Sequence, residues 1–250
     1  MISQLPRRPR QREPDPKYLT VVGHLQELRR RLIVSLLAIT AGSVAGWFVA
    51  PAVIHLIDAP LRASLRGHGQ LIVTTVYGGF TLQLKVAIII GFACALPVTL
   101  YQIWGFVAPA FGATPNRYAP IFIGSGLGLF AAGATTGFLV IPLAVSFFVK
   151  FQSSDLQLLP FANEYVGFVA LILIVFGLSF ELPLVLVSLS AIGITSSRWL
   201  ASKRLVAFFG CFVFATVVTP GADFVSPLVL GSILYVLFES SIAISRFIGK

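Results

Sequence analysis

Apolar residues in this chain gather into long runs, separated by short stretches that are polar or rich in Gly and Pro. A helix needs about 20 consecutive, predominantly apolar residues to cross a bilayer. Such runs occur at residues 32–50, 81–104, 118–149, 164–191, 205–219 and 226–244, the fifth and sixth being near the lower limit. The pattern predicts an all-α polytopic membrane protein with six transmembrane helices, built as one membrane domain over residues 18–250.

Prolines and run lengths indicate where the spans depart from straight crossings. Pro51 is expected to end the first span, so that residues 51–80 form an outside loop containing a short amphipathic piece. Pro97 is expected to kink the second span. The third run is too long for one straight crossing of a core of about 30 Å, which favours tilt or extension past the bilayer. Two pairs of glycines in this run favour close helix packing or are neutral: Gly124 with Gly128, and Gly133 with Gly137.

Composition and charge agree with a membrane protein. The chain has 250 residues, 57% of them hydrophobic and 11% charged, whereas soluble domains carry about 25% charged residues. The net charge of +9 does not indicate a nucleic-acid partner, because most of the 18 Lys and Arg residues lie in the N-terminal segment and in segments expected on the inner side. The positive-inside rule therefore predicts that both termini are cytoplasmic.

The N-terminal region has two parts. Residues 1–17 are rich in Pro and Arg and predict a disordered cytoplasmic tail. The basic residues 29–31 before an apolar run look like a secretory signal, but no small-x-small cleavage site follows, which favours a retained first span. Further along, residues 105–116 contain several Gly and Pro and predict a cytoplasmic loop.

Two glutamates are candidates for function. Glu27 lies among arginines beside the first span, where it either forms a binding site or pairs with Arg30 or Arg31 as in an ordinary cytoplasmic flank. Glu181 lies inside an apolar run, and an acid at membrane depth costs on the order of 2.5–3.5 kcal/mol on insertion scales. Glu181 is therefore expected to form an intramembrane polar site, with a hydrogen-bonded core acid as the alternative.

Other polar residues indicate less. Glu239 lies closer to an interface, where a structural and a functional role are equally open. Asp223 follows Pro220 and Gly221 and is most simply a turn residue or a helix N-cap. The two cysteines read as packing residues, and the three scattered histidines have no metal-ligand spacing, so no metal site is predicted.

Motifs of catalysis are missing from the sequence. It contains no Walker motif, no His-Glu-x-x-His and no Gly-x-Ser-x-Gly. We therefore expect a protein that is not an enzyme and uses no cofactor. Any work that it does would need an ion gradient or a partner.

Several stretches together resemble the TatC family, the multi-spanning subunit of the twin-arginine, or Sec-independent, protein translocase. The resemblance covers about Tyr18 to Lys250 and agrees in order, spacing and six-span topology. It is carried by His24-Leu25-Gln26-Glu27-Leu28-Arg29-Arg30-Arg31, Ala59-Pro60-Leu61, Leu96-Pro97, Tyr101-Gln102-Ile103-Trp104-Gly105-Phe106-Val107-Ala108-Pro109-Ala110, Phe176-Gly177-Leu178-Ser179-Phe180-Glu181-Leu182-Pro183, Gly193-Ile194-Thr195, and Thr219-Pro220 with Asp223.

The resemblance implies a glove-like, concave bundle in the cell membrane that binds the twin-arginine signal peptide of folded cargo and uses the proton motive force. It places signal-peptide binding on Glu27 and Phe106, with Arg29 and Arg117 beside them. Pro115 stands where the family has a second acid. Either Glu13 or Asp15 takes the place of that acid, or the signal peptide is bound more weakly, or its recognition has changed.

The resemblance also implies partners and structural positions. Single-span subunits of the TatA/TatB type would be contacted through Thr219 and Asp223, near Pro227, which stands where a glutamine is common. Membrane lipid and further copies of the chain are the other expected partners. Glu181 would make the concave cavity polar. The implied structural prolines are Pro60, Pro97 and Pro109.

Two other functions remain open at this point. A secondary transporter of small solutes would use Glu181 as a proton or cation site, although the first and last three spans show no convincing internal repeat. The second is a scaffold that keeps the fold but no longer recognises signal peptides, and Pro115 is the feature that favours it.

Overall fold

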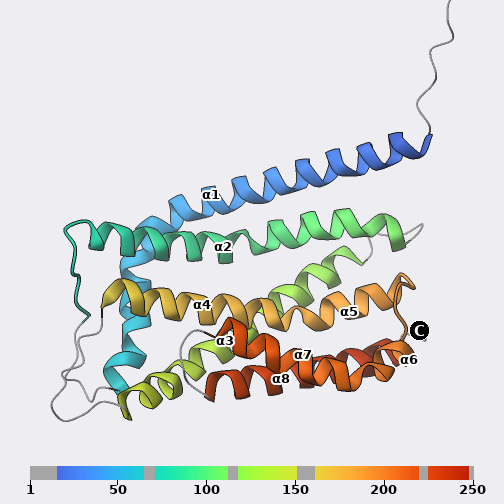
Figure 1. Cartoon of the computed structure of the whole chain (residues 1–250). Helices are drawn as coiled ribbons and strands as arrows, with labels where there is room; N and C mark the ends of the chain where they lie inside the picture. The colour runs from blue at the N-terminus through green and yellow to red at the C-terminus, as the bar shows by residue number, and fades with distance from the viewer. Residues whose placement is uncertain (1–15, 65–70, 112–117, 151–160, 220–224, 248–250) are drawn as a thin grey trace, which may run out of the picture.

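The computed structural model of this chain describes residues 16–64, 71–111, 118–150, 161–219 and 225–247. These residues are helical apart from turns and one isolated β-bridge between Ile72 and Phe161. Figure 1 shows the arrangement of α1 (Pro16–Ser64), α2 (Gly78–Val107), η1 (Ala108–Phe111), α3 (Ala119–Lys150), α4 (Ala162–Phe180), α5 (Leu182–Ala191), α6 (Ser197–Ser202), α7 (Arg204–Val218) and α8 (Val225–Phe247).

The described helices confirm an all-α membrane protein. Five are long and apolar enough to cross a bilayer: Gly23–Arg62 within α1, α2, α3, the unit Ala162–Ala191 formed by α4 and α5, and α8. Of these, α3 has 32 residues and is about 48 Å long, which agrees with a single helix longer than the bilayer core. The apolar α7 has 15 residues and is about 22 Å long. Six crossings therefore stay a prediction.

The first helix is longer than the sequence indicated. Pro51 and Pro60 lie inside α1, so the expected helix end at Pro51 is wrong, and the amphipathic piece expected beyond it continues the same helix to Ser64. Figure 1 shows this C-terminal part, in light blue, turning away from the rest of α1. A proline removes one backbone hydrogen bond and bends a helix. Burial of Ala50 and Ile57 on both sides of Pro51 stabilises the continuation.

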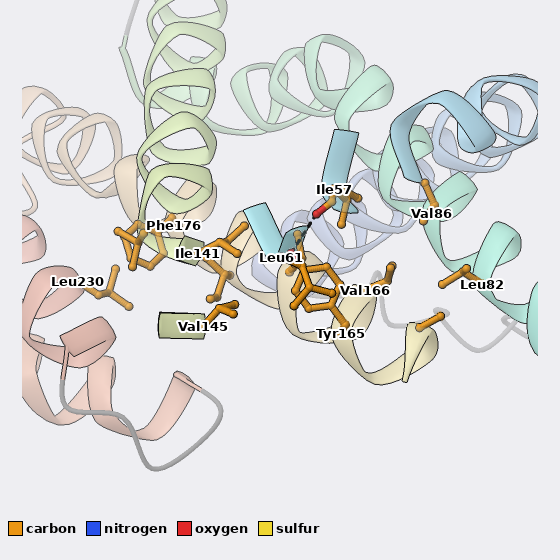
Figure 2. Close-up of a cluster of buried hydrophobic side chains, with 14 of the residues drawn as sticks. Ile57, Leu61, Leu82, Val86, Ile141, Val145, Tyr165, Val166, Phe176 and Leu230 are labelled. Atoms are coloured by element: carbon orange, nitrogen blue, oxygen red, sulfur yellow. Dashed lines mark hydrogen bonds between the residues drawn. The ribbon is translucent and has the colours of Figure 1, made fainter. Parts of the chain in front are cut away.

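The main hydrophobic core joins the turned part of α1 to α2, α3, α4 and α8, and Figure 2 shows a cluster of its side chains. Tyr165 of α4 lies within this core, and its hydroxyl donates a 2.9 Å hydrogen bond to the backbone carbonyl of Ile57. Fully buried residues of the same core come from several helices and include Val86, Ile141, Val166 and Leu230. The hydrogen bond satisfies a carbonyl near Pro60 and fixes the turned segment against α4.

Small residues decide how closely the helices approach. A Cβ atom at Gly133 of α3 would lie 2.5 Å from the carbonyl oxygen of Phe176, and one at Gly137 would lie 3.0 Å from the Phe176 side chain. Gly124 and Gly128 have nothing within 4 Å. Close packing is therefore confirmed for the second glycine pair, and the first pair takes no part in it.

Two helix ends differ from the sequence pattern. The stretch expected to be a loop from residue 105 is helical through Val107 and continues as η1. The fourth run divides into α4 and α5, with Glu181 at the break. Pro183 explains the break, because it has no N–H for the preceding turn but is tolerated in the first turn of α5. Pro97, in contrast, lies inside an unbroken α2.

Candidate functional site

The candidate site lies where the N-terminal half of α1 runs beside the C-terminal end of α2 (Figure 1). The basic box of α1 begins at His24, and α2 ends in the turn that contains Gln102, Gly105 and Phe106. The helices pass closely because of small residues deeper in the interface. A Cβ at Gly46 of α1 would lie 2.7 Å from the carbonyl oxygen of Ala87 of α2.

Glu27 is held by Arg31, one helical turn away. The Nη2 and Nε atoms of Arg31 lie 2.5 Å and 3.1 Å from the same oxygen, Oε1 of Glu27. The Glu27 side chain is 40% exposed and that of Arg31 is 23% exposed. Arg31 therefore supplies a counter-charge to the Glu27 carboxylate from the next turn of the same helix.

Arg31 also reaches across to α2. Its Nη1 atom lies 3.3 Å from the backbone carbonyl oxygen of Gln102 and 3.4 Å from the side-chain Oε1 of the same residue. A Cβ on Gly105 would collide with Nη1 of Arg31. Gln102 and Gly105 could not be predicted as site residues from the sequence, because only the packing of α2 against α1 brings them to the arginine.

Phe106, one turn beyond Gln102 on α2, belongs to the same site. Its ring stacks on that of His24, with centroids 4.3 Å apart and an interplanar angle of 26°. Next to it, a groove of about 470 Å³ runs between α1 and α2, with mainly apolar walls. The groove is lined by Leu28, Arg31, Leu32, Ser35, Leu36, Ile39, Thr99, Gln102, Ile103 and Phe106. The site therefore combines one carboxylate, an aromatic ring and an apolar wall.

The structure brings together only some of the residues predicted to bind a signal. Glu27 and Phe106 flank one site, whereas Arg29 is exposed at its edge. Arg117 lies outside the described residues, as do Pro115 and the tail acids Glu13 and Asp15. The pairing of Glu27 with Arg31 is the local ion pair that an ordinary flank would also have, so geometry alone leaves the function of Glu27 open.

A second polar position lies deeper in the molecule. Glu181 stands at the break between α4 and α5, and both of its carboxylate oxygens are buried without a hydrogen-bond partner among the described residues. It faces a groove of about 860 Å³ between these helices and α6, α7 and α8. Lys203 lines the same groove, whose remaining walls are mostly apolar. The hydrogen-bonded core acid considered for Glu181 is therefore not what the described residues form.

The family model for "Sec-independent protein translocase protein (TatC)" matches residues 23–232. This chain belongs to the TatC family. The predicted resemblance is thereby confirmed, and the chain is a multi-pass protein of the cell membrane from a family of protein translocase components that work with other Tat components.

Relatives named TatC are similar over nearly the whole chain. The protein of Deinococcus radiodurans is 33% identical over 238 residues, covering 93% of this chain and 88% of the relative. That of Escherichia coli (strain K12) is 33% identical over 232 residues, covering 92% and 90%. A crystal structure of the twin-arginine translocase receptor TatC matches with a TM-score of 0.78 at 30% identity, covering 91% of this chain and 100% of that one.

The resemblance also implied residues for partner contact and structural prolines, and their surroundings differ. Thr219 is buried and its hydroxyl donates to the carbonyl of Ala215 at 2.6 Å, whereas Asp223 lies outside the described residues. Of the implied structural prolines, Pro60 is buried, and Pro97 and Pro109 are exposed.

Glu239, whose role the sequence left open, has intrachain partners. Nε of Arg204 lies 2.8 Å from Oε1, Nη2 of Arg204 lies 2.8 Å from Oε2, and the Tyr235 hydroxyl donates to Oε1 at 3.1 Å. The two bonds from Arg204 join α7 to α8 and favour the structural role.

Proposed function

We propose that this protein is the receptor subunit of a twin-arginine translocase and that it binds the signal peptide of folded cargo at the facing ends of α1 and α2. The observation that carries the proposal is the Glu27 carboxylate, held by Arg31 and three residues from His24, whose ring stacks on Phe106, in a chain of the TatC family. A guanidinium and a carboxylate form charge-assisted, directional hydrogen bonds, so Glu27 suits an arginine better than a lysine.

The surroundings of Glu27 match the two parts of a signal peptide. Such peptides have a charged N-terminal part followed by an apolar segment of about 7–15 residues. The carboxylate offers a counter-charge to the first part. Phe106 and the apolar groove beside it offer a surface for residues that follow. With Pro115 in place of a second acid, Glu27 is the acid of this site on which the proposal depends.

The second groove suits a partner helix. Its walls are mostly apolar, and it is lined by Glu181, a buried acid without a hydrogen-bond partner among the described residues. A single-span subunit of the TatA/TatB type with one polar residue would satisfy Glu181 there. Transport would draw on the proton motive force, since the sequence has no nucleotide-binding motif.

We also propose that both termini are cytoplasmic. The N-terminal end of α1, the C-terminal end of α2 and helix α6 lie at the same side of the molecule in Figure 1. These segments carry Arg29, Arg30, Arg198 and Lys203. By the positive-inside rule this distribution supports a cytoplasmic side for the candidate site, where cargo is first met.

Binding of a twin-arginine signal peptide to the full-length protein in lipid nanodiscs tests the proposal, with a Lys-Lys variant of the peptide as control. We expect affinity for the Arg-Arg peptide to exceed that for the Lys-Lys peptide by about tenfold or more, the difference made by losing one charge-assisted contact. Equal or absent binding of the two peptides would favour the scaffold that has lost signal reading.

The solute transporter lacks comparable support. The relatives described above are named as protein translocase components, and none of their names indicates a small solute. Solute uptake by liposomes that contain only this protein would support the transporter function.

A further inference from the structure

We propose that Arg31 is a positioning residue of the signal-binding site: it holds Glu27 by one carboxylate oxygen, is itself anchored to α2, and leaves the other oxygen to the arginine of the signal. The inference rests on the proposed function and assigns a role to three residues that sequence reasoning did not place in the site, namely Arg31, Gln102 and Gly105.

The bonds of Arg31 point in two directions. Nε and Nη2 both end on Oε1 of Glu27, and among the described residues Oε2 accepts no bond. Nη1 points the other way, toward the two oxygens of Gln102. The planar guanidinium can do both at once because its five N–H groups form a rigid fork, whereas a lysine presents its three donors from a single nitrogen atom and has no such fork.

Gly105 provides the space for this bridge. Beyond the collision with Nη1, a Cβ there would lie 2.8 Å from Cζ and 2.9 Å from Nη2 of Arg31. The residue is helical and has no positive φ, so its backbone does not demand glycine. Glycine in a helix interior is less favourable than alanine. Its presence at this position is explained by the guanidinium that lies against it.

The bridge has a consequence for recognition. A carboxylate whose rotamer is already held loses less conformational freedom when a ligand binds. Oε2 then faces the incoming guanidinium in a fixed direction, although the positive charge of Arg31 also repels that guanidinium. Arg31→Lys keeps the charge and removes the fork, so it separates positioning from repulsion.

The test measures binding of Arg-Arg and Lys-Lys signal peptides to the full-length chain in nanodiscs of phosphatidylethanolamine and phosphatidylglycerol. We compare Arg31→Lys, Gly105→Ala and the double variant. Each single change is expected to weaken Arg-Arg binding by about tenfold and to reduce the preference over Lys-Lys, as expected when a hydrogen bond to a charged group is lost. The double variant should bind no more weakly than the weaker single variant, because both changes break the same bridge.

Two matched controls come from α1. Arg30→Lys makes the same substitution at an exposed neighbour, and Gly23→Ala adds a Cβ where nothing lies within 4 Å. Both should bind like the wild type. If Gly105→Ala does not fold, as judged by circular dichroism, the contrast between Arg31→Lys and Arg30→Lys still decides the question.

The outcomes separate the two proposals. A wild-type protein without preference for Arg-Arg over Lys-Lys would overturn the proposed function and this inference with it. A wild-type preference that Arg31→Lys leaves unchanged would overturn the positioning role alone. Tighter binding by Arg31→Lys would show that Arg31 competes for Glu27, and additive losses in the double variant would show that Gly105 acts independently of Arg31; either result contradicts the bridge.

Discussion

Glu27 and Glu181 are both acids in a largely apolar chain, but the structure treats them in opposite ways. Glu27 is 40% exposed and already accepts two hydrogen bonds from Arg31. Glu181 is deeper, and neither of its oxygens has a partner among the described residues. A surface acid can be tied by a neighbour at little cost, whereas a buried acid without a partner is expensive. This difference agrees with the two proposals, that the first site recognises a charge and that the second is completed by a partner.

The largest effect is expected at the exposed acid. Glu27→Ala should reduce export of a twin-arginine cargo by about 30-fold or more, since truncating one member of an interfacial charge pair typically costs 2–5 kcal/mol. Export is measured in cells that depend on this protein, with its membrane level checked by immunoblot. Glu164→Ala, at an exposed acid in the first turn of α4, is the control and should export normally. Normal export by stable Glu27→Ala protein would contradict the proposed role of Glu27 in signal binding.

The next effect concerns Glu181. Glu181→Leu should lower export about tenfold while raising the free energy of unfolding by on the order of 1–3 kcal/mol, because an uncompensated acid is removed from the membrane interior. Thermal unfolding of the purified protein gives the stability. Glu181→Gln keeps a polar group and should retain more export. A less stable Glu181→Leu protein would mean that the acid stabilises the fold and is not a site kept for a partner.

A third effect concerns the packing of α3 against α4, the helix that ends at Glu181. Gly133→Ala should destabilise the protein by about 1–3 kcal/mol, because the added Cβ meets the carbonyl oxygen of Phe176 at 2.5 Å and forces α3 away from α4. Gly128→Ala, in the same helix with nothing within 4 Å, should be neutral or slightly stabilising. The two unfolding temperatures are compared in one detergent. Equal values would contradict close packing at Gly133.

The smallest effect is expected at Glu239, which like Glu27 is paired with an arginine of its own chain. Glu239→Gln should leave export close to normal, because Glu239 binds Arg204 across α7 and α8 and Tyr235 within α8, and it lines neither of the two grooves described above. Export and protein level are measured beside those of Glu27→Ala. A loss of export as large as that of Glu27→Ala would show that breaking any such ion pair is harmful, and it would contradict a specific role of Glu27 in signal binding.

Much of the fold could be predicted from hydrophobic run length. The runs at residues 81–104, 118–149 and 226–244 correspond to α2, α3 and α8, because only a helix satisfies its own backbone in lipid. The end of the first helix could not be predicted in this way. Proline statistics favour a stop at Pro51, but burial of Ile57 and Leu61 in the core keeps the helix going.

The candidate sites likewise have a part that could be predicted from the sequence and a part that could not. The one-dimensional chain was enough to select Glu27 and Glu181, because an acid beside or inside an apolar run is rare and costly wherever the chain folds. Phe106 was implied only by the resemblance to the TatC family. The bridge from Glu27 through Arg31 to Gln102 was not accessible, since residues 71 positions apart meet only when α2 packs on α1. The missing partners of Glu181 likewise depend on which side chains surround it. Residue chemistry is local and can be read in order, but contacts and burial belong to the packed helices.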